Sequence, residues 1–409
     1  MEEKQWQKTQ RIAVLVAVSC VLQVSESFIP HPIPGLRLGL ANIITLVALV
    51  NVGFGHALEI AILRTFLSSF IMGTFLSFSF ILSISASCVS TIVMGILYSL
   101  ARSRKCALSI IGISILGALS HNIIQLFLAY VLFIHHPGIF VFLPWLLIGG
   151  VFMGWINGMI AARVCSALGS QPVKERVLAV IRPLPLEGVF RTPFNRASGN
   201  PSRHISAEVK IICLFLISTS VLVFHDFRFY ALLFLSLAAL SLVSSGYFKF
   251  LCTRVYRCAG MLLAALLLPF LFSPGADVLF SYFWLRPTYQ GLQAGLLMAM
   301  RLIIFIMGSS LLTVSTPPQE LTRGLSRVLS VLKCFGVSSQ RIATIISLSW
   351  MSLPACSSVF KGMLSGIDFK KAKNLRNLIP LVSELIIVFY LNAENISSMS
   401  QKEFIAVEH

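Results

Sequence analysis

Long apolar segments, separated by short polar ones, dominate this chain. Ten of them reach or approach the length of about 20 residues that a helix needs to cross a bilayer. Six lie in the first half, at Ile12–Ile29, Leu38–Val52, Ala57–Met72, Phe78–Leu100, Ala107–Ile134 and Ile139–Ala162. Four follow at Val209–Phe224, Phe229–Ser245, Ala259–Phe272 and Gln290–Thr313, and the runs Ile342–Cys356 and Leu378–Leu391 look too short to span. The pattern predicts an all-α polytopic membrane protein.

Hydrophobicity is lost between Cys165 and Glu208, where prolines, glycines, serines and basic residues prevail. Such a composition is typical of a linker. We therefore predict a six-span unit at 1–165, a basic, proline-rich cytoplasmic linker at 166–208, and a second unit at 209–409. The second unit holds about four spans, followed by cytoplasmic helices. Neither half repeats the other, which disfavours an inverted-repeat transporter and favours a fusion of two different subunits.

The placement of charge predicts the orientation. Only 11% of residues are charged, against about 25% in soluble domains, and the mean hydropathy is +0.87. With a cytoplasmic N-terminus, 27 of the 32 Lys and Arg residues fall in segments on the inner side, as the positive-inside rule requires. The net charge of +17 therefore reports topology in the cell membrane and gives no reason to expect nucleic-acid binding.

Polar residues inside spans are costly in lipid and mark candidate sites. Asn42 lies early in the second span, and the fifth span carries His121, Asn122 and Gln125. Their side chains could line a pocket for a small molecule in the outer half, or could hold the bundle together through interhelical hydrogen bonds. Glu59 and Arg64 in the third span are expected to neutralise each other.

Several kinds of chemistry find no support in the sequence. There is no phosphate-binding loop of the G-x-x-x-x-G-K-[ST] type, and the three aspartates lie far apart, so a cluster of carboxylates for Mg²⁺ is not expected. The cysteines form no C-x-x-C pair. We predict no catalytic activity, no cofactor and no metal site for this chain.

A basic amphipathic helix follows the last long span. Thr316 can serve as its N-cap and Pro317 as its first residue. Its apolar face includes Leu321, Leu325 and Leu329, while Arg323 and Arg327 lie elsewhere around the helix. A helix of this kind is expected to lie at the membrane surface or to bind a partner there.

The first half resembles a known family. The stretches "LGLANIITL", "GTFLS" and "ISILGALSHNIIQLFLAY" resemble the Gx transporter family, also labelled heptaprenyl diphosphate synthase component I. That family is similar to the substrate-binding S components of energy-coupling factor (ECF) vitamin transporters. The resemblance implies that Ala13 and Ala17, a small-x-x-x-small pair on the first span, contact the transmembrane T component.

The second half resembles that T component. "MRLIIFIMGSSLLTVSTPPQELTRGLSRVLSVLKCFGV" follows its pattern of an arginine, an apolar span, a break and a coupling helix. The resemblance implies that Leu321, Arg323, Leu325, Arg327 and Leu329 belong to a coupling helix above cytoplasmic ATPases. Lys402 occupies the position of a docking arginine, and lysine cannot form the bidentate contacts of a guanidinium.

The two resemblances together imply a fused S and T subunit of an ECF-type importer. Its expected partners are the lipid bilayer, cytoplasmic ABC ATPases that hydrolyse ATP, and a small micronutrient, flavin-like or isoprenoid. Movement of the six-helix unit within the membrane would carry the substrate inward. The alternative is a non-transporting anchor or accessory subunit for flavin- or quinone-linked electron transfer, or for heptaprenyl diphosphate metabolism.

Overall fold

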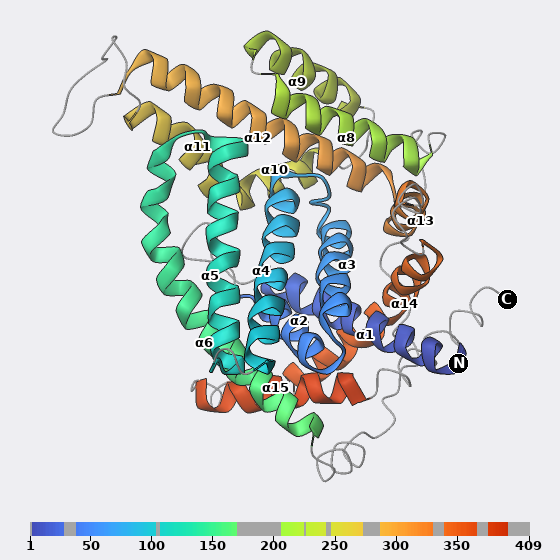
Figure 1. The fold of residues 1–409 in the computed structure, drawn as a ribbon. Helices are drawn as coiled ribbons and strands as arrows, with labels where there is room; N and C mark the ends of the chain where they lie inside the picture. The colour runs from blue at the N-terminus through green and yellow to red at the C-terminus, as the bar shows by residue number, and fades with distance from the viewer. Residues whose placement is uncertain are drawn as a thin grey trace.

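The computed structural model describes residues 2–27, 38–103, 107–169, 206–224, 226–242, 247–272, 287–329, 339–365 and 375–391, and these fold into helices joined by short turns (Figure 1). The helices of the first half are α1 Glu2–Glu26, α2 Leu40–Asn51, α3 Phe54–Met72, α4 Phe78–Arg102, α5 Ile110–Ala129, the π-helix η1 Tyr130–Ile134, the 3₁₀ helix η2 Pro137–Phe142 and α6 Leu143–Gly169. The predicted all-α polytopic class is confirmed.

The second half contributes eight described helices. They are α8 Ala207–Val223, α9 Phe227–Leu242, α10 Tyr247–Arg257, α11 Ala259–Phe272, α12 Tyr289–Ser315, α13 Pro318–Leu329, α14 Ser339–Ser365 and α15 Leu375–Leu391. Two features expected from the sequence lie outside the described residues: most of the linker, and Lys402.

Helices occur at all ten predicted spans, but they differ in length. Six are long and apolar enough to cross a bilayer: α1, α3, α4, α5 with η1, η2 with α6, and α12. The others, α2, α8, α9 and α11, have 12, 17, 16 and 14 residues. At 1.5 Å per residue they are shorter than the hydrocarbon layer of about 30 Å. The pair of α10 and α11 is bent by 55°.

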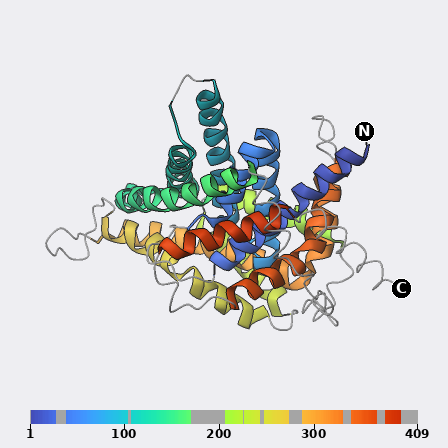
Figure 2. The same ribbon diagram turned by 90° about the horizontal axis from the view of Figure 1, so that it is seen from below.

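Helix α1 forms the centre of the molecule. Each residue from Ile12 to Cys20 is at most 1% exposed. A helix that is apolar on every side is typically surrounded by other helices, and α1 packs against α2 and α3 of its own half and against α14 and α15 of the other. Figure 2 shows α14 beside α1 near the N-terminus, and α15 beside α6.

Helix α12 crosses the first half. In Figure 1 it runs over the upper ends of α3, α4 and α5. Two apolar clusters fill this junction: one joins Phe78, Phe133 and Phe305, and the other joins Phe75, Leu214 and Leu321. The two halves therefore share their cores.

Candidate functional site

A polar cluster surrounds the start of α2. The carboxylate of Glu26 accepts hydrogen bonds from the backbone N–H groups of Gly39 (2.9 Å) and Leu40 (3.2 Å). The amide nitrogen of Asn157 donates to the carbonyl oxygens of Leu38 (2.9 Å) and Gly39 (3.3 Å). Gly39 has a φ of 73°, a conformation that favours glycine. Glu26 of α1 thus satisfies N–H groups that a helix start leaves unpaired, and Asn157 of α6 binds the carbonyl groups just before the helix.

Asn42 and Arg64 extend this cluster into the bundle. The guanidinium of Arg64, which is 3% exposed, donates to Asn42 Oδ1 (2.5 Å) and to Ser87 Oγ (3.4 Å). Three helices, α2, α3 and α4, therefore meet at one buried cation. The expected pairing of Arg64 with Glu59 is wrong, because residues five apart point in different directions around a helix and Glu59 binds residues elsewhere.

The three candidate residues on α5 form a separate group. Asn122 is buried, and its amide donates to the carbonyl of Leu146 on α6 (2.8 Å). His121 is also buried, and the amide oxygen of Gln125 is a buried acceptor that makes no hydrogen bond to the described residues. The hydrogen bonds place Asn42 with Arg64 and Asn122 with α6. The candidate residues thus divide between two places in the bundle.

Glycines on α6 allow this helix to approach α5 closely. Gly150, Gly154 and Gly158 are spaced four residues apart, and a Cβ added at Gly154 would lie 2.7 Å from the Cα of Ile115. At Gly158 it would lie 2.7 Å from the Cα of Ile111. Sequence analysis missed this stripe, although its small-x-x-x-small spacing is visible in "GGVFMGWING".

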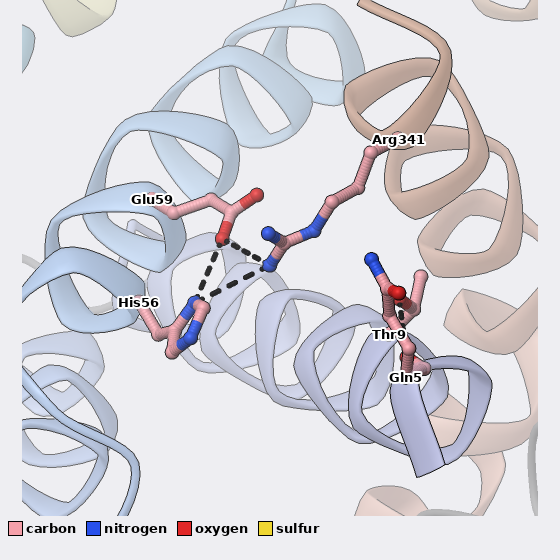
Figure 3. Close-up of polar contacts among 5 residues, drawn as sticks. All are labelled: Gln5, Thr9, His56, Glu59 and Arg341. Carbon is pink, nitrogen blue, oxygen red and sulfur yellow. Dashed lines mark hydrogen bonds and ion pairs between the residues drawn. The ribbon is translucent and has the colours of Figure 1, made fainter. Parts of the chain in front are cut away.

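Glu59 joins the two halves through a charged pair. Its Oε2 accepts from Arg341 Nη2 on α14 (3.2 Å) and lies 3.2 Å from His56 Nδ1, as Figure 3 shows. The same histidine nitrogen lies 3.3 Å from the arginine. A neutral imidazole nitrogen can accept from Arg341 or donate to Glu59, but not both. The three residues connect the start of α3 to the start of α14.

We expect this pair to contribute measurably to the junction. The Glu59 and Arg341 side chains are 19% and 34% exposed, so part of the attraction is screened by solvent. Changing Glu59→Gln, Arg341→Gln and both should give a coupling energy of about 0.5 to 1 kcal/mol in a double-mutant cycle of thermal stability. Strictly additive effects would contradict the pairing.

Ala13 and Ala17 both lie on the buried α1 and are 0% exposed. The face of α14 that is buried includes the small residues Ser349, Ser352 and Cys356, each also 0% exposed. Small side chains permit close packing of helix backbones in membranes. Helix α1 packs against α14, and a role of Ala13 and Ala17 in this contact between the halves stays a prediction.

The turn between α3 and α4 inserts into the second half. Arg254 Nη1 on α10 donates to the Gly73 carbonyl (2.6 Å), and Ser218 Oγ on α8 donates to the Leu76 carbonyl (3.4 Å). A Cβ added at Gly73 would lie 2.4 Å from the Thr313 side chain on α12. Phe75 of the turn packs with Phe70 and with Phe80, at ring-centroid distances of 4.7 and 5.1 Å.

Arg301, the arginine inside α12, contacts a second turn of the first half, at the end of η1. Its Nη1 donates to the Leu132 carbonyl (2.9 Å) and lies 3.3 Å from His135 Nδ1. Its Nε and Nη2 each donate to the Tyr230 hydroxyl at 3.1 Å. That hydroxyl donates in turn to the Phe224 carbonyl (2.7 Å). A buried charge in an apolar helix is thus bound by groups from η1, from its C-cap residue His135 and from α9.

Helix α13 separates apolar from basic residues as its sequence predicts. Leu321 and Leu325 are 1% and 4% exposed, while Arg323 and Arg327 are exposed and Arg327 pairs with Glu208. The helix begins at Pro318, one residue later than expected, because Thr316 ends α12 and accepts a hydrogen bond from Lys210. The Leu329 side chain lies outside the described part of the chain.

Across the described segments, no group of three or more His, Cys, Asp and Glu residues could hold a metal ion. The arrangement defines a class: a polytopic membrane protein of two different halves joined through buried polar contacts.

Comparison with known proteins specifies the halves. Residues 15–164 match the family model described as heptaprenyl diphosphate synthase component I, and residues 198–399 match the model described as cobalt transport protein. Both matches confirm the resemblances predicted from the sequence. The chain is therefore similar to one of these families over its first half and to the other over its second half.

Curated relatives of the second half are named energy-coupling factor transporter transmembrane protein EcfT. The one from Listeria innocua is 28% identical over 208 residues, which is 49% of this chain and 78% of the relative. Those from Thermosediminibacter oceani and Bacillus subtilis are 27% and 23% identical, covering 49% and 47% of this chain and 78% and 76% of the relatives. The second half is thus similar to membrane subunits of ECF transporters.

Proposed function

We propose that this chain is the combined substrate-binding and energy-coupling membrane subunit of an ECF-type importer, with ATP hydrolysed by separate partner proteins. The first half would bind the substrate and the second would couple it to ATPases. Besides the similarity to ECF subunits, one observation carries the proposal. Two turns of the first half, at Gly73 and at His135, contact α12 at separate positions along its length.

The distribution of Lys and Arg puts the N-terminus inside. In that orientation α3 runs outward and ends in an outer turn at Gly73, and α5 with η1 ends in a second outer turn at His135. Helix α12 runs inward, so Thr313 lies near its inner end. If both halves stood upright in one bilayer, Gly73 and Thr313 would lie on opposite sides of a layer of about 30 Å.

The two outer turns instead contact α12 at well-separated positions. Gly73 meets Thr313, and His135 meets Arg301. These α12 residues are 12 positions apart, which corresponds to about 18 Å along a helix. The outer end of the first half thus faces the side of α12. This geometry supports a resting state in which the six-helix unit lies on its side against an upright second half.

The helices proposed to couple the two halves contact the first half. Helix α13 packs against α8 and reaches α3, while α14 packs against α1. A displacement of α13 and α14 by bound ATPases would therefore act on the first half directly. We propose that it alternates between this lying position and an upright position that loads substrate from outside.

The substrate is proposed to be a small micronutrient bound within the first half. The polar side chains proposed to contact it are Asn42 and Arg64 near the start of α2, and His121 and Gln125 on α5. Hydrogen-bonding side chains in an otherwise apolar bundle suit a compound with a large apolar or aromatic part, such as a flavin-like or isoprenoid molecule.

Co-purification tests the proposal. The full chain, tagged and extracted in mild detergent from its native membrane, should retain a pair of nucleotide-binding ATPases identified by mass spectrometry, while membranes lacking the tagged chain should yield none. Recovery of redox or prenyl-transfer proteins without ATPases would overturn the importer and support the membrane-anchor alternative.

A further inference from the structure

We infer that Arg254 and Arg301 are positioning residues that hold the first half in its lying position by binding backbone carbonyls at two outer helix ends. The inference rests on the proposed importer function, because it assigns the residues that stabilise one state of that cycle.

Both arginines bind the same kind of group. Arg254 Nη1 binds the carbonyl of Gly73, the C-cap residue of α3, at 2.6 Å. Arg301 Nη1 binds the carbonyl of Leu132, in the last turn before the end of η1, at 2.9 Å. The last carbonyls of a helix have no partner within it and carry the negative end of the helix dipole. A cation near these carbonyl groups is therefore stabilising, whichever side chains the turn carries.

Each arginine is oriented by an aromatic residue of its own half. The Arg254 guanidinium lies over the Phe250 ring, 4.7 Å from its centroid. Arg301 is fixed by two hydrogen bonds to the Tyr230 hydroxyl. One side of each guanidinium is thus held permanently within the second half, and Nη1 is presented to the first half. Raising the first half would break the contacts that Nη1 of each arginine makes with it.

The close packing of the turn between α3 and α4 makes the Arg254 contact specific for this position of the first half. Gly73 has a φ of +60°, and its Cα approaches Thr313 and Arg254 so closely that an added Cβ would lie 2.4 and 2.6 Å from them. Only a turn without a side chain at this position lets Arg254 reach the carbonyl. The contact is therefore built for this one docked position.

Accessibility of the turn provides the test. In the full chain, with its nine cysteines replaced, Thr74→Cys places a thiol in the half-buried turn. A membrane-impermeant maleimide added to intact cells should label it slowly. Arg254→Gln or Arg301→Gln should increase the labelling rate about tenfold, equivalent to about 1.4 kcal/mol. The exposed Arg228→Gln, which removes the same charge elsewhere in the second half, should leave the rate unchanged.

Conservative variants separate a positioning role from general loss of folding. Lysine can still donate to one carbonyl, so Arg254→Lys should restore slow labelling, whereas Arg301→Lys cannot bind Tyr230 and Leu132 together and should label fast. Gel filtration should show a single species for every variant. Slow labelling in both glutamine variants, or fast labelling in Arg228→Gln, would overturn this inference and leave the proposed function standing. Fast labelling of the unaltered turn would instead contradict the lying position, and with it the proposed mechanism.

Discussion

Changing Gly154→Ala and Gly158→Ala together will sharply reduce the stability of the first half. Each new methyl group would lie 2.7 Å from a backbone Cα of α5, at Ile115 and at Ile111. Backbone atoms cannot rotate away as a flexible side chain can, so α5 and α6 must separate along this face. Overpacking of this kind costs about 1 to 3 kcal/mol for each site. Thermal melting in detergent, followed by gel filtration, measures the loss.

Gly55 provides the matched control for this prediction. It lies in α3, and an added Cβ there meets no atom within 4 Å. Gly55→Ala should therefore be neutral or slightly stabilising, since alanine favours a helix over glycine by about 1 kcal/mol. If the double variant melts like Gly55→Ala, the close packing of α5 and α6 is not a determinant of stability. Restoring glycine at either site should recover part of the loss.

The hydrophobic pattern predicted where helices form, because an apolar run of sufficient length has few alternatives in a membrane. It could not predict that α2 would be only 12 residues long. Val52 and Gly53 turn the chain straight into α3, and Glu26 and Asn157 hold the start of α2 from other helices. These contacts come from residues distant in the sequence, which periodicity does not report.

Polar partners were harder to predict than helices. Proximity in sequence suggested that Glu59 and Arg64 would pair, but the partner of Glu59 is Arg341, 282 positions away. A side chain inside a bundle can be satisfied by any helix that packs against its face. The arginine within α12 could be recognised as unusual from the sequence. Its partners could not be predicted, because Tyr230 comes from another helix of the second half and Leu132 depends on how the two halves meet.

Changing Leu321→Asp and Leu325→Asp together will detach α13 and abolish coupling. Both leucines are buried in the cluster that contains Ile211 of α8 and Phe75 of the outer turn. Burial of an unpaired carboxylate is strongly unfavourable, and loss of each leucine side chain alone costs about 2 to 5 kcal/mol. The ATPases should no longer co-purify, melting should shift to lower temperature, and labelling of Thr74→Cys should become fast.

A variant on the opposite face of α13 distinguishes a loss of ATPase docking from a loss of folding. Arg323→Asp with Arg327→Asp changes two exposed residues, and the ion pair between Arg327 and Glu208 is a surface pair, a kind that typically contributes at most about 1 kcal/mol. This variant should keep its melting temperature and its slow labelling of the turn, yet lose the ATPases if α13 presents its basic face to them. ATPases retained by the arginine variant but lost by the leucine variant would mean that α13 supports the junction without forming the docking surface. The two variants introduce the same two aspartates into opposite faces of one helix, so their comparison tests which face the junction needs and which face the ATPases need.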